Sequence, residues 1–128
     1  MIPPRRILLA DDDHEVRAGV ADLLAPLGLE FLHAESGPEA LEILRAERQR
    51  LNLMLLDMHM PGFGGLEVIQ RVGSEMEDFT LPFICCSGEA TDELERMALS
   101  VGAQAFMRKP IQPLALRGEV MRILEIPN

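Results

Sequence analysis

The chain alternates short apolar runs with longer segments in which apolar residues recur every three or four positions. The five runs cover residues 6–10, 29–34, 51–56, 81–86 and 104–108. The first, third and fourth are almost continuously apolar, which is typical of strands buried on both faces of a parallel sheet. The recurring positions predict five amphipathic helices. Their expected buried faces are Val16/Val20/Leu23/Leu24/Leu27, Ala40/Leu41/Leu44, Leu66/Ile69/Val72/Met76, Leu94/Met97/Ala98/Val101 and Leu116/Val120/Ile123/Leu124.

Strands alternating with helices predict an α/β fold with right-handed crossovers and helices on both faces of the sheet. For five strands we expect a doubly wound, flavodoxin-like parallel sheet in the order 2-1-3-4-5, with five helices. The length of 128 residues suits a single domain over residues 1–128. Ligands of such sheets bind outside the carboxyl ends of the strands, so the residues at those ends are the candidates for a functional site.

Composition narrows the classes of function. With 21 acidic and 12 basic residues the net charge is −9, which argues against direct binding to nucleic acid or to an anionic membrane. No apolar run is long enough to span a bilayer, and no signal peptide is expected at the N-terminus. The two cysteines, Cys85 and Cys86, are adjacent and have neither a disulfide framework nor metal-ligand spacing, which favours a reducing cytoplasm.

Polar residues follow directly on four of the apolar runs. They are the triplet Asp11-Asp12-Asp13, then Asp57, Ser87 and Lys109. The fold would place them on one edge of the sheet, where the carboxylates repel one another and need either a counter-ion or raised pKa values. Oxygen ligands without a Cys or His cluster favour a hard cation, and Mg²⁺ is the usual one. Capping of the next helix accounts for Asp13 equally well but not for the whole set.

Lys109 is the only lysine among twelve basic residues. A solvated surface charge would be served equally well by arginine. The compact ammonium of a lysine can instead pair with a carboxylate or a phosphoryl oxygen. Pro110 follows it, and a cis bond at this X-Pro step would aim the ammonium back over the sheet.

Four segments in order, residues 7–13, 55–62, 84–88 and 106–110, resemble the signature segments of response-regulator receiver domains of two-component systems. The resemblance implies that Asp57 accepts a phosphoryl group from a histidine kinase or a histidine phosphotransfer protein. It also implies that Asp11, Asp12 and Asp57, with the backbone carbonyl of His59, hold Mg²⁺. The domain would then be a phospho-acceptor that takes part in its own phosphorylation and dephosphorylation, not an enzyme acting on other substrates.

The same resemblance assigns further roles. Lys109 and Ser87 would bind phosphoryl oxygens, and Ser87 with Phe106 would form the switch read by an output domain or effector protein. His59 and Glu89 would tune the rate of dephosphorylation. Ser87 replaces the more frequent threonine, and Gly64-Gly65 replaces the usual Asp-Gly, with an expected effect on the local turn only.

Two alternatives stay open at this point. A small haloacid-dehalogenase-like phosphatase would use Asp11 as its nucleophile, although Glu15 stands where that family has Thr or Val and no later acidic pair follows a strand. An unphosphorylated interaction module of the same fold usually loses an acidic residue or the lysine, and this chain keeps both.

The last predicted helix carries a candidate partner surface. A helical wheel puts Leu114, Gly118 and Met121 nearly opposite its sheet-facing side. A glycine inside a helix costs roughly 1 kcal/mol relative to alanine, which is easier to understand if a partner packs closely there. We therefore expect a homodimer or effector contact on the face made by the fourth helix, fifth strand and fifth helix.

Overall fold

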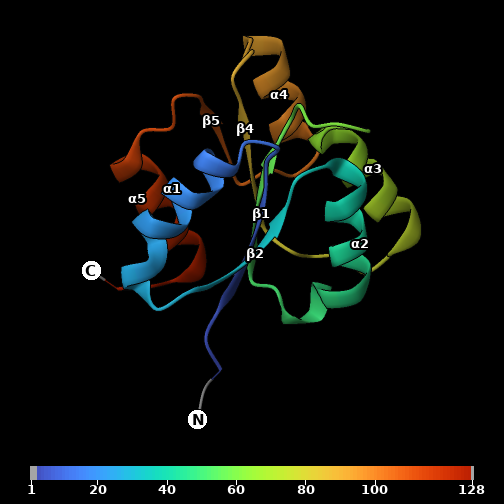
Figure 1. The fold of residues 1–128 in the computed structure, drawn as a ribbon. Helices are drawn as coiled ribbons and strands as arrows, with labels where there is room; N and C mark the ends of the chain where they lie inside the picture. The colour runs from blue at the N-terminus through green and yellow to red at the C-terminus, as the bar shows by residue number, and fades with distance from the viewer. Residues whose placement is uncertain (1–2, 128) are drawn as a thin grey trace.

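The computed structural model describes residues 3–127 of the chain and forms one sheet with helices on both sides (Figure 1). The strands are β1 (Arg6–Ala10), β2 (Glu30–Ala34), β3 (Leu53–Asp57), β4 (Phe83–Ser87) and β5 (Ala105–Arg108). The helices are α1 (His14–Leu24), α2 (Gly37–Glu47), α3 (Gly65–Glu75), α4 (Asp92–Ser100) and α5 (Pro113–Leu124). Short 3₁₀ turns follow α1 and α2, at Ala25–Leu27 and Arg48–Arg50.

The sheet is entirely parallel and has the order β2-β1-β3-β4-β5, which confirms the predicted doubly wound topology. Helices α1 and α5 cover one face, and α2, α3 and α4 cover the other (Figure 1). None of the helices within residues 3–127 is long and apolar enough to cross a membrane.

Alternation along the central strands divides the core into two clusters. In β1, Leu8 faces the α2–α4 side and Leu9 faces the α1–α5 side. Cys85 and Cys86 divide in the same way, as their adjacent positions predict. Burial raises the pKa of both thiols to about 12, so neither is a ready nucleophile or metal ligand.

Capping side chains fix the start of the first two helices. The Asp13 carboxylate accepts hydrogen bonds from the N–H groups of Glu15 and Val16, so its predicted capping role is confirmed. Ser36 caps α2, because its hydroxyl accepts a hydrogen bond from the N–H of Glu39 at 3.2 Å. The Glu39 carboxylate in turn accepts one from the N–H of Glu35 at 3.3 Å.

Three predicted helix faces are wrong in part. In α4, Ala98 is buried and Leu94 is half-buried as predicted, but Met97 and Val101 are 44% and 41% exposed.

In α3 the buried residues are Gly65, Val68 and Val72, whereas Leu66 and Ile69 are only half-buried. A Cβ on Gly65 would lie 2.7 Å from the carbonyl oxygen of Asp57, so this helix meets β3 through its first turn and is rotated accordingly.

In α5 the correction concerns the candidate partner surface. Met121 is only 8% exposed and belongs to the buried side, together with Leu116, Val120 and Leu124. The buried arc is therefore wider, and centred closer to Met121, than the wheel assumed. Leu114 is 82% exposed and Gly118 is exposed, as predicted.

Candidate functional site

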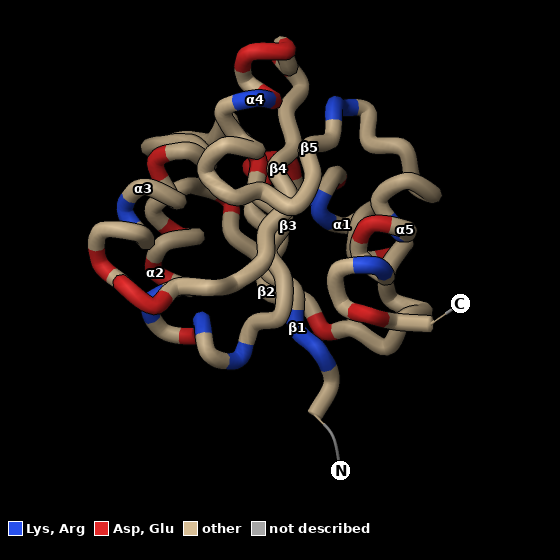
Figure 2. Tube along the Cα trace, turned by 180° about the vertical axis from the view of Figure 1, so that it is seen from behind, with Lys and Arg blue, Asp and Glu red and all other residues tan. Residues whose placement is uncertain are grey.

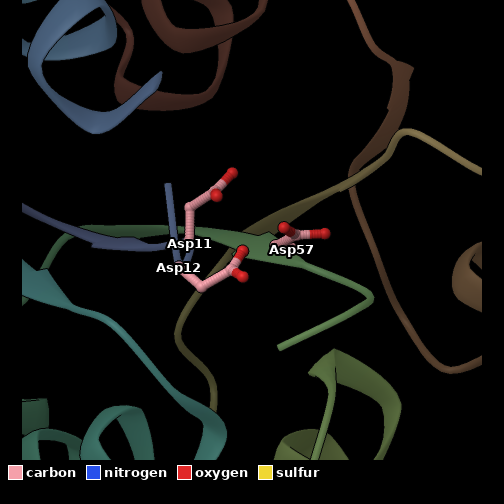
Figure 3. Close-up of side chains that lie close together, drawn as sticks. All are labelled: Asp11, Asp12 and Asp57. Atoms are coloured by element: carbon pink, nitrogen blue, oxygen red, sulfur yellow. The ribbon is translucent and has the colours of Figure 1, made fainter. Parts of the chain in front are cut away.

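Three carboxylates meet at the carboxyl ends of the two central strands. Asp57 is the last residue of β3, and Asp11 and Asp12 directly follow β1, its neighbour in the sheet. One carboxylate oxygen of each lies within 4.8 Å of one from the other two, and Figure 3 shows the three side chains close together. The parallel pairing of β1 with β3 thus brings Asp57 to residues that are 45 and 46 positions earlier in the sequence, as predicted from their places at the strand ends.

Asp57 is nearly sealed, with 4% of its surface exposed. Its Oδ1 accepts a hydrogen bond from the N–H of His59 at 3.1 Å, and its Oδ2 accepts one from Lys109 Nζ at 3.0 Å. Burial raises the pKa of Asp57, repulsion from Asp11 adds to this effect, and the two hydrogen bonds offset only part of it. The carboxylate is therefore held in one orientation and is almost inaccessible to solvent.

Lys109 bridges the two buried acids. Its Nζ donates to Asp11 Oδ2 at 2.7 Å as well as to Asp57 Oδ2. Burial works against the ammonium, but the hydrogen bonds to Asp11 and Asp57 outweigh it, so the pKa of Lys109 lies above its usual value. Its backbone N–H donates to the carbonyl of Ser87 at 2.9 Å, which ties the end of β5 to the end of β4. The Lys109-Pro110 peptide bond is cis.

The donor set fits a small hard cation. Asp11 and Asp57 are buried and Asp12 is exposed, so the oxygens form an anionic cup that opens to solvent on one side. Within residues 3–127, no histidine or cysteine side chain joins this cluster. Three carboxylate oxygens and one ammonium leave a net negative charge, which suits Mg²⁺ better than a soft transition metal.

The two predicted switch residues, Ser87 and Phe106, lie on β4 and β5. Ser87 is fully buried, and its Oγ accepts a hydrogen bond from the N–H of Glu89 at 3.2 Å, so the hydroxyl stands at the start of the β4–α4 loop. Phe106 pairs with Cys85 across the sheet, is half-buried, and packs against the core cluster on the α2–α4 side. His59 and Glu89 are exposed, one on each of the loops that follow Asp57 and Ser87.

Leu114 and Gly118 are not part of this cluster and lie exposed on α5. No neighbouring atom lies within 4 Å of a Cβ built on Gly118, so the described part of the chain supplies no close packing there.

Sequence reasoning missed Arg17, a buried arginine on α1. Its Nε donates to the backbone carbonyl of Asp11 at 2.9 Å, and its Nη2 donates to Glu35 Oε1 at 3.4 Å. The signal was present, since Arg17, Val20 and Leu24 recur at the spacing of three and four that marks the buried face of α1.

Comparison with known proteins places this architecture in a family. The family model of the response regulator receiver domain matches residues 7–121. The regulatory protein VanR of Enterococcus faecium is 30% identical over 115 residues, which are 90% of this chain and 48% of VanR. An uncharacterised 14.6 kDa protein of Leptolyngbya boryana is 34% identical over 110 residues, which are 86% of this chain and 82% of that protein.

Solved structures agree with this match. The crystal structure of a CheY-like response regulator receiver domain protein from Methanospirillum hungatei superposes with a TM-score of 0.83 at 27% identity, covering 96% of this chain and 95% of that one. This chain spans about half the length of VanR, and 15% of the length of some larger curated relatives. The chain belongs to the response regulator receiver domain family of two-component signalling.

Proposed function

We propose that this domain is a phosphorylation switch and that Asp57 is its phospho-acceptor. The observation that carries the proposal is the arrangement at the end of β3, where a buried carboxylate lies beside an ammonium and two further carboxylates. The donor would be the phosphohistidine of a histidine kinase or a histidine phosphotransfer protein. Family membership does not favour the alternative of a phosphatase that uses Asp11, and the intact acidic set with Lys109 argues against an unphosphorylated module.

In the transfer, an oxygen of Asp57 forms a bond to phosphorus while the P–N bond to the donor imidazole breaks. The released imidazole nitrogen takes up a proton. The Asp57 carboxylate is a weak nucleophile, so its fixed orientation between the His59 N–H and Lys109 is what readies it for in-line attack. Lys109 offsets the negative charge that gathers as two anions approach.

Asp11, Asp12, Asp57 and the backbone carbonyl of His59 are the groups that would hold Mg²⁺. When bound, the ion supplies positive charge that lowers the repulsion between the acidic site and the incoming phosphoryl group. Asp12, exposed at the rim, is the one of the three acids placed to meet the ion first.

The new phosphoryl group would be read through Ser87 and Phe106. The Ser87 hydroxyl can donate to a phosphoryl oxygen, which would draw in the loop that begins at Glu89. Phe106 pairs with Cys85, two residues before Ser87, and is only half-buried, so a change of its rotamer would alter the α4–β5–α5 face. The exposed side chains of His59 and Glu89 flank the route by which water reaches the acyl phosphate, and we propose that they set its lifetime.

The partner surface is proposed on Leu114 and Gly118, with Met121 now removed from it. Exposed Leu114 and the open space over Gly118 leave room for a second copy of this domain or an effector protein. The net charge is −9, and acidic positions are interspersed with basic ones over the helices and loops (Figure 2). Both observations argue against direct nucleic-acid binding by this domain. The single domain over residues 1–128 and a cytoplasmic location stay predictions.

The test is phosphorylation by acetyl phosphate, followed by intact-mass spectrometry. With Mg²⁺ we expect one added phosphoryl group, which is lost on Asp57→Asn or with EDTA. Asp78→Asn changes an exposed aspartate of the α3–β4 loop and should leave the labelling unchanged. Full labelling of Asp57→Asn would show that the acceptor lies elsewhere.

A further inference from the structure

Arg17 is a buried arginine outside the proposed phosphoryl-binding residues, and it contacts the backbone of the Asp11–Asp13 segment. The Arg17 side chain is 6% exposed, although it carries a permanent charge. Arginines are rarely buried without a specific partner, because desolvating the charge is costly. The partners of Arg17 therefore indicate what its burial achieves.

The strongest of these contacts is with backbone. Arg17 Nε donates to the Asp11 carbonyl at 2.9 Å, and Asp11 in turn donates its own N–H to the carbonyl of Ala34 at 3.0 Å. The peptide groups on either side of the Asp11 Cα are thus held from α1 and from β2. A charge-assisted bond to a carbonyl is stronger than a neutral one, so this contact is a firm anchor.

The second contact fixes the plane of the guanidinium. Nη2 reaches Glu35 Oε1 at 3.4 Å, on the loop between β2 and α2. Glu35 keeps 68% of its side chain exposed, so this ion pair is weak and serves mainly to orient the group. The planar fork of an arginine can meet both partners, and a lysine with one nitrogen cannot do so in the same way.

The Asp11 side chain is already held by other groups. Its Oδ1 accepts from the N–H of Asp13 at 2.9 Å, and its Oδ2 accepts from Lys109. The direction of Asp12, which is exposed at the rim, follows from the backbone that Arg17 holds. Arg17, Asp11 and Asp57 also line one small, mostly apolar cavity of about 20 Å³.

We propose that Arg17 is a positioning residue, which holds the Asp11–Asp12 backbone in the form that binds a divalent cation. The proposal rests on the Mg²⁺ site proposed above. Arg17 would affect how tightly the cation binds and not the rate of phosphoryl transfer. The reason is that Arg17 forms a hydrogen bond to the backbone that carries the metal ligands and not to the Asp57 carboxylate.

The test measures Mg²⁺ affinity directly, by isothermal titration calorimetry on Arg17→Lys and Arg17→Met. Loss of a contact that orients a metal ligand typically weakens metal binding by about 10–100-fold, and we expect this range for both variants. At saturating Mg²⁺ the rate of phosphorylation by acetyl phosphate should stay within about threefold of wild type, which separates positioning from chemistry. Urea unfolding would confirm that each variant is folded under the conditions of the titration.

Two matched variants serve as controls. Glu35→Gln keeps the shape of the ion-pair partner, and we expect less than threefold loss of affinity because the backbone contact of Arg17 is intact. Arg45→Met removes an exposed arginine that pairs with Glu75 across the α2–α3 surface, and it should not change the affinity. A folded Arg17→Lys or Arg17→Met variant that binds Mg²⁺ like wild type would overturn the proposal.

A measurement on the wild-type protein covers the case in which neither Arg17 variant folds. In nitrogen-15 NMR spectra the Arg17 Nε–H should exchange slowly with water and shift when Mg²⁺ is added, whereas the Nε–H of exposed Arg71 should not shift with Mg²⁺. An Arg17 Nε–H that exchanges as fast as that of Arg71, or ignores Mg²⁺, contradicts the assignment. Absence of Mg²⁺ binding by the wild type would instead refute the metal site itself.

Discussion

Lys109→Met should destabilise the fold when no divalent cation is present, because Asp11 and Asp57 lose the ammonium that they share. Lys109 Nζ lies 2.7 Å from the Asp11 carboxylate and 3.0 Å from that of Asp57. At an effective dielectric constant of about 20, unit charges about 3 Å apart attract by roughly 5–6 kcal/mol. Desolvation of the ammonium offsets much of this, and removing one partner of a buried pair costs about 3–5 kcal/mol.

The expected loss here is smaller, because 21% of the Lys109 side chain is exposed. Water can enter the vacated space, and one of the two carboxyl groups can take up a proton. We therefore expect a loss of about 1–3 kcal/mol, less than the roughly 3–5 kcal/mol of a sealed pair. With an unfolding entropy of about 2.1 cal/mol/K per residue, 128 residues give about 270 cal/mol/K, so the melting temperature should fall by about 4–11 °C.

Thermal and urea unfolding in EDTA, followed by circular dichroism, measure this loss. Arg96→Met removes one positive charge from the exposed surface of α4 and should change stability by no more than about 0.5 kcal/mol. Added Mg²⁺ should recover part of the loss in Lys109→Met, and the loss should shrink in an Asp57→Asn background. A Lys109→Met variant as stable in EDTA as Arg96→Met would refute the shared counter-charge.

Three further predictions concern the shape of the Lys109 cation, the space around two glycines and the pKa of Asp57. Lys109→Arg keeps the charge but should slow phosphorylation and abolish the partner response, because a planar guanidinium does not replace a compact ammonium; wild-type rates and assembly would contradict this. Gly118→Ala should stabilise the fold by about 0.5–1 kcal/mol in urea unfolding, since its Cβ meets no atom within 4 Å, whereas Gly65→Ala should destabilise it through contact with the Asp57 carbonyl. Burial, and after it repulsion from Asp11, raises the pKa of Asp57 in the folded state. Wild type should therefore lose stability relative to Asp57→Asn as the pH rises from the pKa of Asp57 in the unfolded chain to its pKa in the folded protein. Urea unfolding in EDTA across this pH range measures the difference in stability between the two proteins, and a difference that does not change with pH would contradict the prediction.

The sheet could be predicted because each of its strands is marked by a short apolar run in the sequence. The apolar runs gave all five strands within two residues, and strand–helix alternation left few topologies to choose from. Asp57, Ser87 and Lys109 were found for the same reason, since a polar residue after a buried strand stands out in a single sequence. Their meeting in space is a consequence of strand order.

The residues that escaped prediction depend on neighbours that a single helix does not contain. The α3 pattern is apolar on more than one side, and only the close contact of Gly65 with β3 decides which side is buried. Met121 lies on the flank of an arc whose centre is set by how α5 lies against the sheet. Arg17 was overlooked because a charge in a helix is expected to face water, and its partner is a carbonyl on another element.

The central claim, that Asp57 is the residue that carries the phosphoryl group, is tested most directly by locating the modification. The domain would be phosphorylated with acetyl phosphate and Mg²⁺, treated with borohydride to reduce the acyl phosphate to an alcohol, digested, and sequenced by tandem mass spectrometry. We predict that the aspartate converted to homoserine is Asp57. Homoserine at Asp11, with Asp57 unchanged, would contradict the claim and point to the phosphatase-like chemistry instead.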